Sequence, residues 1–381
     1  AGGAWSFIQP ALTVNNDLTI ATGTVTLPTA TTTIAGSFTN SGGTFLHNNA
    51  TVKFTAASAK TITLSGTPFP NAFYDVLFSG SGSWAFTEAN ATTSHTFKIT
   101  QGTVTLPSNT LTVAGSFTNT AGTFVHNSGT VKFTSSGAAT ISANASFGNL
   151  LFSGSGSWAL SNSSVSAVGN VTISSGTVTL PSGTFTIGGS FTNSAAFVHN
   201  SGTVLFNAST MGKTIDPGSS SFNNLTFNSA TGGWTVSANA TSTNNTTLTA
   251  GTFTLSSGKR LAVGGTFTNS AGGASTTWSG STLALGAGAY TINTKTTGAD
   301  VYGTLVVKAN TDIKMWNSSA ATYTVDATGS LYSQDHSGVD GSLYILRDYV
   351  RTSGTEHWDY ATDFDGTALG TSSRQVTGKI N

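Results

Sequence analysis

The sequence has no cysteine, few charged residues and no long apolar run, and each absence narrows the class of protein. Without cysteine among its 381 residues, the chain has no disulfide and no thiolate metal site. Charged residues make up 7% of it, against about 25% in an ordinary globular protein, and 14 basic residues balance 14 acidic ones. Because phosphate binding needs clustered Lys and Arg, and a membrane span needs about 18–20 apolar residues, we expect no nucleic-acid partner and no membrane span.

The residues that are abundant indicate an all-β protein. Gly, Ser, Thr, Ala and Asn fill much of the chain, and good helix formers are scarce. Val, Ile, Leu, Phe and Trp recur at short intervals, whereas disordered chains carry high charge and few aromatic residues. Zero cysteine with few lysines and many Thr, Ser and Asn is common in secreted prokaryotic surface proteins.

Three sequence markers recur at the same interval, which indicates tandem duplication. The markers are the first residue of GTVTLP or GTFTLS, the Phe of [ST]FTN, and a Trp that follows a run of small residues. Each recurs after about 75 residues, so we predict four copies near 17–96, 97–170, 171–245 and 246–298. The markers lie at Gly23, Gly102, Gly176 and Gly251, at Phe38, Phe117, Phe191 and Phe267, and at Trp84, Trp158 and Trp234.

One copy divides into three pieces, each with three short runs of alternating apolar residues. In 170–189 these runs are VTI, TVTL and FTI, separated by Gly, Ser and Pro. Such runs between turn residues are strand signals. We therefore predict a parallel β-helix, or β-solenoid, with about three strands per coil and three coils per repeat, and successive coils about 4.8 Å apart. A string of immunoglobulin-like sandwiches or a propeller suits a unit of this length less well.

The segment 299–381 differs from the repeats in residues 1–298. It holds ten of the 14 acidic residues and is richer in Tyr and Asp. Because the open end of a solenoid exposes unpaired backbone groups, repeat arrays need atypical terminal units. We expect a β-rich cap here, or a segment that contacts the next subunit.

The repeats resemble a known class of surface protein. The phrases GSFTNSGGTFLHNNATVKF and FSGSGSWAL look like the repeats of prokaryotic adhesin-like proteins. More broadly, they are similar to the β-helical stalks of filamentous-haemagglutinin and autotransporter-type adhesins. The resemblance covers about residues 17–299 and implies a non-enzymatic role at the cell surface.

Three histidines recur in register and are the first candidates for a site: His47, His126 and His199. With three coils per repeat they would lie about 14 Å apart along the solenoid, whereas zinc needs ligands at about 2.0–2.1 Å. The fourth copy has Trp278 near the same position. We therefore expect no metal, and a histidine at each strand end that packs and hydrogen-bonds at a corner.

The recurrent tryptophans allow two interpretations. Trp84, Trp158 and Trp234 would also lie about 14 Å apart. An exposed row would be a candidate glycan-binding surface, because aromatic rings stack on sugars. A buried row would fill the widest coil of each repeat, and large aromatics dominate core energetics. The core interpretation is favoured, and the exposure of the indoles decides between the two.

Acidic residues are too sparse in the repeats for the usual carbohydrate-cleaving chemistry. Residues 1–298 carry Asp17, Asp75, Glu88 and Asp216, which are spread over the copies and suggest no catalytic pair. No GxSxG nucleophile motif occurs with acid and histidine partners. We therefore expect no catalytic residues and no enzyme activity.

Calcium is the one cofactor that the sequence suggests. Asp359, Asp363 and Asp365 in DYATDFDG are spaced like oxygen ligands of a calcium loop, but no Glu closes the loop. Asp335 and Asp340 form a second such candidate. Polar turn residues are the favoured explanation of both stretches, and calcium binding is the alternative.

Taken together, these features favour an extracellular structural protein. Both ends of a solenoid are sheet edges, so copies can stack head-to-tail, and contacts of that kind generate open filaments. We expect a surface stalk or filament subunit whose main partner is another copy of itself. The alternative is an adhesin that binds carbohydrate or another surface, and a polysaccharide lyase or hydrolase is a distant third.

Overall fold

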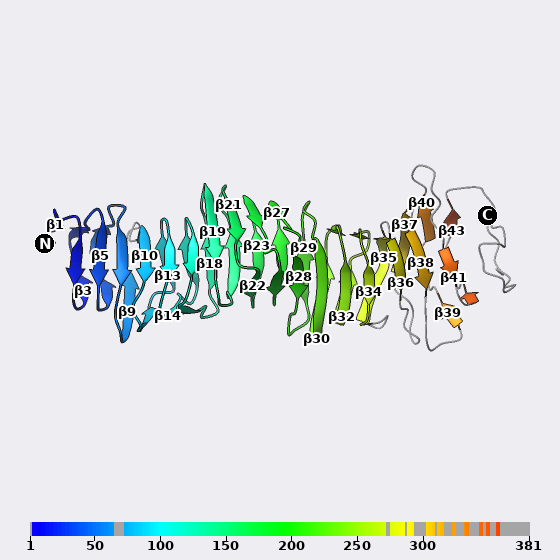
Figure 1. Cartoon of the computed structure of the whole chain (residues 1–381), viewed down its shortest axis with the longest axis horizontal. Helices are drawn as coiled ribbons and strands as arrows, with labels where there is room; N and C mark the ends of the chain where they lie inside the picture. The colour runs from blue at the N-terminus through cyan, green and yellow to red at the C-terminus, as the bar shows by residue number, and fades with distance from the viewer. Residues whose placement is uncertain are drawn as a thin grey trace. The chain divides into compact units, whose positions relative to one another are not determined.

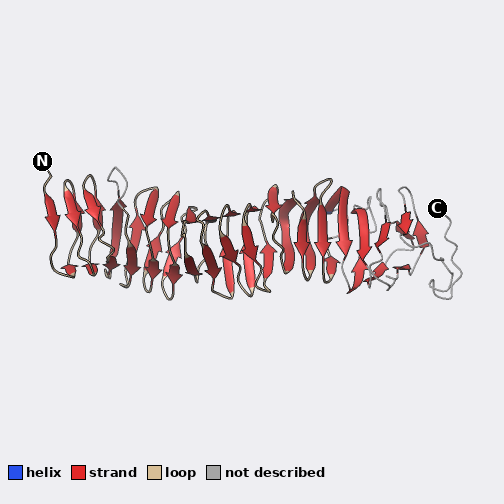
Figure 2. Cartoon of the chain, turned by 90° about the horizontal axis from the view of Figure 1, so that it is seen from above, coloured by secondary structure: helices blue, strands red, loops and turns tan. Residues whose placement is uncertain are grey.

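A computed structural model of the chain describes residues 2–64, 72–271 and 275–285, together with strands between 288 and 358. It divides into two compact units, Ala1–Phe185 with Ser194–Phe197, and Thr186–Asn193 with Val198–Asn381. The described residues of both units are strands and turns, without an α-helix (Figure 2).

The first unit is a stack of short parallel strands that follow one another in chain order (Figure 1). Most strands are three or four residues long, and Gly, Ser, Asn or Pro occupies the turns between them. The first sheet contains β1 (Ala4–Ser6), β4 (Thr24–Thr26) and β7 (Thr44–Leu46). The second contains β2 (Leu12–Val14), β5 (Thr31–Ile34), β8 (Thr51–Phe54), β10 (Asp75–Phe78), β13 (Phe97–Ile99), β16 (Phe117–Asn119), β19 (Ala138–Ser142), β21 (Ser157–Leu160) and β24 (Thr177–Thr179).

Two further groups of strands complete the coils of this unit. The third sheet contains β3 (Leu18–Ile20), β6 (Phe38–Asn40), β9 (Ala59–Leu64), β11 (Ser83–Phe86), β14 (Thr103–Thr105) and β17 (Thr123–Val125). The fourth contains β12 (Asn90–Thr93), β15 (Thr110–Val113), β18 (Thr130–Phe133), β20 (Asn149–Phe152), β22 (Ser164–Ala167) and β23 (Val171–Ile173). The strand β25 (Thr184–Ile187) and the strand β27 (Ala196–Val198) lie at the division between the units.

The second unit has the same parallel pairing with longer strands. Its strands up to residue 285 are β26 (Phe191–Asn193), β28 (Thr203–Phe206), β29 (Lys213–Asp216), β30 (Asn224–Val236), β31 (Ala240–Ser242), β32 (Thr246–Leu255), β33 (Arg260–Val263), β34 (Phe267–Asn269) and β35 (Thr276–Leu285). Both β30 and β32 are long because each runs through a corner and pairs on two faces, with register shifts after Phe227 and Asn228. The backbone continues in β36 (Gly288–Ile292), β37 (Tyr302–Lys308), β38 (Thr311–Met315), β39 (Thr322–Thr324), β40 (Leu331–Gln334), β41 (Leu343–Ile345), β42 (Asp348–Val350) and β43 (Glu356–Trp358).

Strand pairing confirms the predicted β-solenoid, which makes about 13 turns. Val76 pairs with Phe97, and Phe97 pairs with Phe117, so one coil takes about 20 residues here. Each strand places alternate side chains inside, and Thr, Ser or Lys side chains point outward between them. The predicted boundary near residue 298 stays a prediction, although parallel pairing continues beyond it in β37, β40 and β43.

The pairing refines the predicted size of the repeat. One repeat, from β10 up to its equivalent β20, comprises ten strands, β10 to β19, and one segment that is bridged only at Phe147. With three segments per coil, a repeat advances by roughly three and two-thirds coils instead of three. As a result, β10 and β20 belong to different sheets. Equivalent residues of successive copies therefore do not form rows along one face.

The strand that sequence analysis missed is the same in each copy. It is β12, β22 or β31, and its inward residues are small or polar, such as Ala91 and Thr93 in β12. These residues carry too little apolar signal to mark a strand. Their backbones are nevertheless in register, because Asn90 pairs with Thr110 and Thr93 with Val113.

Aromatic residues stack along the interior and form the core. The rings of Phe97 and Phe117 are stacked and nearly parallel, with centroids 5.2 Å apart and an angle of 2° between their planes. Phe54 stacks on Phe78 in the same way, at 5.2 Å and 13°. Such pairs contribute about 0.5–1.5 kcal/mol each beyond the area that they bury. The ladder depends on an unbroken register from coil to coil.

The glycine that begins GTVTLP is required by its backbone conformation and by its neighbours. Gly102 has a φ of +78°, which disfavours any side chain. A Cβ atom there would lie 2.4 Å from the carbonyl oxygen of Gly82 and 2.8 Å from the ring of Trp84. Gly176 has the same φ and the same contact with Trp158. This glycine recurs because, in each copy, the chain passes close to an indole at this corner.

We predict that Gly102→Ala destabilises the protein by at least about 1–2 kcal/mol, because alanine must adopt a positive φ against backbone atoms that cannot move away. Thermal unfolding of the purified variant measures the loss. Gly137→Ala is the matched control, because a Cβ atom at Gly137 meets nothing within 4 Å. Equal melting temperatures for the two variants would contradict this account.

Candidate functional site

Each recurrent histidine closes a tight turn with its own side chain. At His126, the imidazole Nδ1 accepts the backbone N–H of Ser128 at 3.0 Å, and the carbonyl oxygen accepts the N–H of Gly129 at 2.9 Å. Asn127 and Ser128 between them have φ values of 50° and 57°. Two successive residues with positive φ favour Asn and small polar residues, which explains the HNS and HNN sequences. The equivalent bonds to Nδ1, also 3.0 Å long, form at His47 and His199.

These turns confirm the predicted role of the histidines at strand ends. His47 follows β7 in the first sheet, and His126 follows β17 in the third. The two imidazoles therefore lie on different faces of the first unit and cannot share a metal ion. Among the described residues, no three His, Asp or Glu side chains lie close enough together to hold one.

In the fourth copy, Trp278 does not have the role of the histidines near whose position it falls in the sequence. Trp278 is fully buried in β35, where its ring packs 5.3 Å from Phe253 and 5.8 Å from Phe267. Its indole N–H donates to the carbonyl oxygen of Phe253 at 3.3 Å. Trp278 is thus a core residue of a strand and does not occupy a turn.

The candidate glycan-binding tryptophans are core residues as well, which corrects that assignment. Trp84 and Trp158 are 1% exposed and Trp234 is 2% exposed. They pack on Phe78, Phe152 and Phe227 at 5.3–5.4 Å. A buried indole cannot stack on a sugar, and Trp84 and Trp158 also lie in different sheets. The favoured core interpretation therefore holds.

A stack of three rings is the most distinctive cluster on the surface of the first unit. Tyr74 lies between His47 and His95, with ring centroids 5.4 Å and 4.9 Å away. His95 is nearly parallel to Tyr74, at 16°, and His47 is tilted by 33°. The three rings lie side by side because they come from three successive coils of the solenoid. We call this set the histidine–tyrosine stack.

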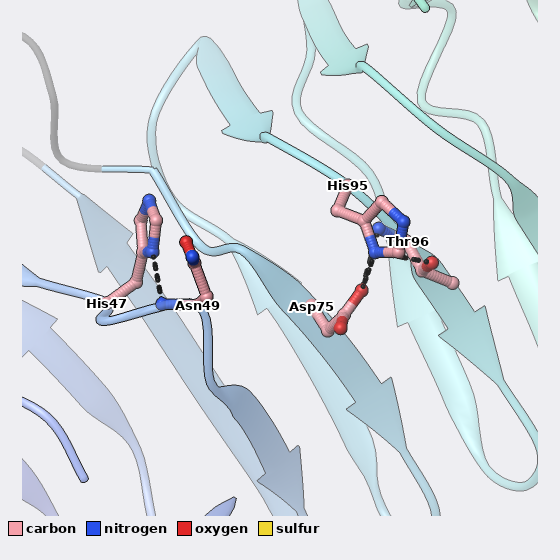
Figure 3. A network of polar contacts seen from close by, with 5 residues as sticks. All are labelled: His47, Asn49, Asp75, His95 and Thr96. Atoms are coloured by element: carbon pink, nitrogen blue, oxygen red, sulfur yellow. Dashed lines mark hydrogen bonds and ion pairs between the residues drawn. The ribbon is translucent and has the colours of Figure 1, made fainter. Parts of the chain in front are cut away.

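An acidic residue, Asp75, contacts His95 of this stack; Figure 3 shows the contact between the two side chains. The Nδ1 atom of His95 lies 2.8 Å from Oδ1 of Asp75, and the Thr96 backbone N–H donates to the same carboxylate oxygen at 2.9 Å. The His95 side chain is 53% exposed and that of Asp75 is 25% exposed. Sequence analysis found no pair for Asp75. A coil length of 20 residues, which separates Asp75 from His95, is the signal that would have found it.

Other copies of the repeat have an asparagine at the position of Asp75. Asn224 is the equivalent of Asp75, and its Oδ1 accepts the Asn244 side-chain amide at 3.0 Å. It also accepts the backbone N–H of Asn245 at 3.3 Å. Asn149 accepts the Asn170 N–H in the same way, at 2.8 Å. The common feature is an oxygen that binds the backbone of the next coil at a corner, so Asp75 first of all performs a structural task.

The pair lacks the arrangement that activates a nucleophile. In a Ser-His-Asp triad, the nucleophile and the acid bind opposite nitrogens of the imidazole. Here the Thr96 hydroxyl and the Asp75 carboxylate both approach Nδ1 of His95, at 3.2 Å and 2.8 Å. Asp17 and Asp216 likewise accept backbone N–H groups, from Ser37 at 2.7 Å and Gly218 at 2.9 Å.

A buried asparagine at the end of FTN is another feature that sequence analysis missed. It is at most 3% exposed in all four copies, at Asn40, Asn119, Asn193 and Asn269. Asn40 accepts the Gly43 N–H at 3.0 Å, and Asn193 donates to the Pro217 carbonyl oxygen at 2.8 Å. These bonds tie the strand end to the following corner. Only the repetition of FTN in the sequence hinted at such a role.

The calcium candidates lie outside the described residues. This applies to Asp359, Asp363 and Asp365, and also to Asp335 and Asp340. Calcium binding by the C-terminal segment stays a prediction.

Comparison with known proteins gives no relative from which a role can be transferred. No protein-family model, no curated protein and no solved structure matches the chain. In the described part of the chain, no helix is long and apolar enough to cross a membrane. A function must therefore be argued from the molecule's own edges, turns and surface clusters.

We predict that Asp75→Asn leaves the free energy of unfolding within about 0.5 kcal/mol of wild type, because an amide oxygen still accepts the Thr96 N–H. Asp75→Ala leaves that N–H without its acceptor and costs about 1 kcal/mol. Chemical denaturation measures both values. A large loss in the asparagine variant would mean that the charge on Asp75 is essential.

We also predict that acid weakens the turn at His47. Burial lowers the pKa of His47 below its ordinary value of about 6.5, and its Nδ1 accepts a hydrogen bond only when unprotonated. Because the pKa is lower in the folded than in the unfolded state, this histidine stabilises the fold above about pH 6.5, and its contribution is lost as the pH falls.

His47→Asn is the matching variant for this prediction, because an asparagine side chain accepts the same N–H and does not titrate. The free energy of unfolding of both proteins is measured between about pH 8 and about pH 5. The difference between the two proteins removes the contributions of all other titratable groups. Wild type should lose more stability than the variant on acidification. If the difference in stability between wild type and His47→Asn does not change with pH, His47 titrates alike in the folded and unfolded states, which would contradict the prediction.

Proposed function

We propose that this chain is a non-enzymatic, extracellular structural protein, a surface stalk or filament subunit that assembles head-to-tail. The observation that carries the proposal is the parallel pairing of successive coils, because a ladder of this kind can be extended by any further parallel strand. Strands β1, β2 and β3 each stand at the end of their sheet's strand order. Each therefore has a parallel neighbour on one side only, among the residues that the structure describes.

The free edge of β3 shows which backbone groups are available. The Leu18 N–H donates to the Ser37 carbonyl oxygen at 2.9 Å, and the Ile20 carbonyl oxygen accepts the Ser41 N–H at 3.1 Å. Because residues alternate along a parallel strand, the N–H and C=O of Thr19 between them point to the opposite side. A further parallel strand can bind there, as β6 does on the inner side.

The C-terminal strands provide edges of the complementary kind. Among the described residues, strands β41, β42 and β43 each stand last in a parallel set, in the orders β36-β38-β41, β39-β42 and β37-β40-β43. Like β1, β2 and β3, they are three residues long. A second copy is thus a partner that offers parallel strands of matching length, and contacts between unlike ends produce open chains.

The sides of the solenoid suit close packing in such an assembly. Its formal net charge is zero, and its outward positions are mostly Thr and Ser, so copies do not repel one another. The burial of Trp84, Trp158 and Trp234 removes the tryptophan row from the surfaces with which a carbohydrate-binding adhesin was expected to bind. Self-assembly is therefore favoured over polysaccharide binding.

We predict that the purified chain forms linear chains of copies as its concentration rises, and that Thr19→Pro suppresses them. Proline removes the N–H at the free edge of β3 while leaving the bonds from Leu18 and Ile20 to β6 intact. Electron microscopy and sedimentation velocity measure assembly, and circular dichroism checks the fold.

The matched control is Thr118→Pro in β16, a strand with neighbours on both sides in β13 and β19. There the same change removes a hydrogen bond of the ladder in the middle of a sheet and should lower the stability of the fold. Monomers alone at high concentration of the wild-type chain would overturn the proposal.

A further inference from the structure

The strand pair β10 and β13 carries ionisable and aromatic side chains that its equivalents in the other copies lack. Strand pairing identifies these equivalents as β20 with β23, and as the first parts of β30 and β32. At four surface positions the first pair has Tyr74, Asp75, His95 and Lys98. The equivalents hold small or amide side chains there, namely Gly148, Asn149, Gly169 and Thr172, and Asn223, Asn224, Asn244 and Thr247. The solenoid therefore folds without these four side chains, and departures of this kind from a local pattern are expected at functional sites.

Two lysines lie on the same face as this group. Lys53 of β8 and Lys98 of β13 pair on either side of Leu77 of β10, so they belong to one outward row, two coils apart. Neither lysine forms an ion pair with another described residue. The carboxylate nearby, that of Asp75, is bound by His95 at 2.8 Å. This face therefore has two positive charges that no carboxylate neutralises.

His95 presents a fixed and partly open ring beside Lys98. One face of its imidazole stacks on Tyr74, with ring centroids 4.9 Å apart. The next coil has Gly115 in line with His95, so the ring stack ends there, and the His95 side chain is 53% exposed. Because Nδ1 is held by Asp75, Nε2 remains available to a ligand.

We infer that this face binds an acidic polysaccharide, whose carboxylate groups lie on Lys98 and Lys53 and one of whose sugar rings lies against the open face of His95. The site is on the side of the solenoid and uses none of the buried tryptophans. It adds a ligand to the proposed structural protein and does not depend on head-to-tail assembly.

The form and charge of the face favour this ligand over other macromolecules. Its side chains come from successive coils, so an extended chain can contact all of them at once. Lysines form charge-assisted hydrogen bonds with carboxylates. A protein partner usually needs an apolar centre to its interface, whereas Leu77 is the one aliphatic side chain in this row and is half-buried. Two lysines are also too few for the phosphate contacts of a nucleic-acid site.

The test measures binding of polygalacturonate, an unbranched chain of acidic sugars, by calorimetry at concentrations where the protein is monomeric. Lys98→Thr introduces the residue of the equivalent strands and should weaken binding about tenfold. His95→Asn introduces the residue found at Asn244 and should weaken it as well. Lys132→Thr is the matched control, because Lys132 is an outward lysine of β18 in a different sheet, and it should bind like wild type. Circular dichroism checks that each variant is folded.

A second measurement follows the histidines directly. Nuclear magnetic resonance of isotope-labelled histidine side chains is recorded while polygalacturonate is added. The His95 signals should shift, and those of His126, which follows β17 in another sheet, should not.

Each alternative outcome overturns a stated part of this inference. Equal weakening by Lys98→Thr and Lys132→Thr would show attraction by overall charge, and the assigned site would be wrong. Equally tight binding of neutral galactan, of polyphosphate or of single-stranded DNA would show that the ligand class is wrong. Absence of binding at low salt would overturn the inference altogether. Head-to-tail assembly is tested by electron microscopy of the protein alone, so it stands or falls separately.

Discussion

Backbone pairing between consecutive coils is the interaction on which the rest of this structure depends. Each coil of about 20 residues places its strands in register on the preceding coil, as Phe97 does between Val76 and Phe117. Register aligns inward side chains into stacks, and it brings corner atoms of successive coils within bonding distance. The histidine turns and the Asn or Asp acceptors bind backbone N–H groups at the corners, and the corner glycines allow the close approach of successive coils.

Much of the fold could be predicted because period-two alternation and repeated markers are local signals. The size of the repeat could not, because one strand in ten has inward residues as small as Ala91 and Thr93. When that strand is overlooked, the residues after it are predicted on the wrong face of the solenoid. The predicted rows of histidines and tryptophans therefore separate onto different sheets, although the corner role of the histidines and the core role of the tryptophans were predicted correctly.

The polar cluster at Asp75 was beyond sequence analysis for a different reason. Its contacts join His95 to Asp75 and to Tyr74, and only a known coil length makes His95 a neighbour of Asp75. Comparison between copies then shows what the cluster does. Asn224 and Asn244 form the same contact with neutral amide side chains. The geometry is therefore a general feature of this solenoid corner, and the copy that contains Asp75 and His95 places ionisable side chains there. Internal repetition separates structural roles from special ones here, where no relative is at hand.

The distribution of charge along the strands points to the same conclusion as the open edges. Natural sheets protect free edges with Lys, Pro or bulges, because an unprotected edge binds other strands. Here the outward lysines Lys53 and Lys98 lie in β8 and β13, which have neighbours on both sides. The edge strands β1, β2 and β3 read AWS, LTV and LTI, with neither charge nor proline. An edge of this kind can pair with a further parallel strand, as the proposed head-to-tail assembly requires.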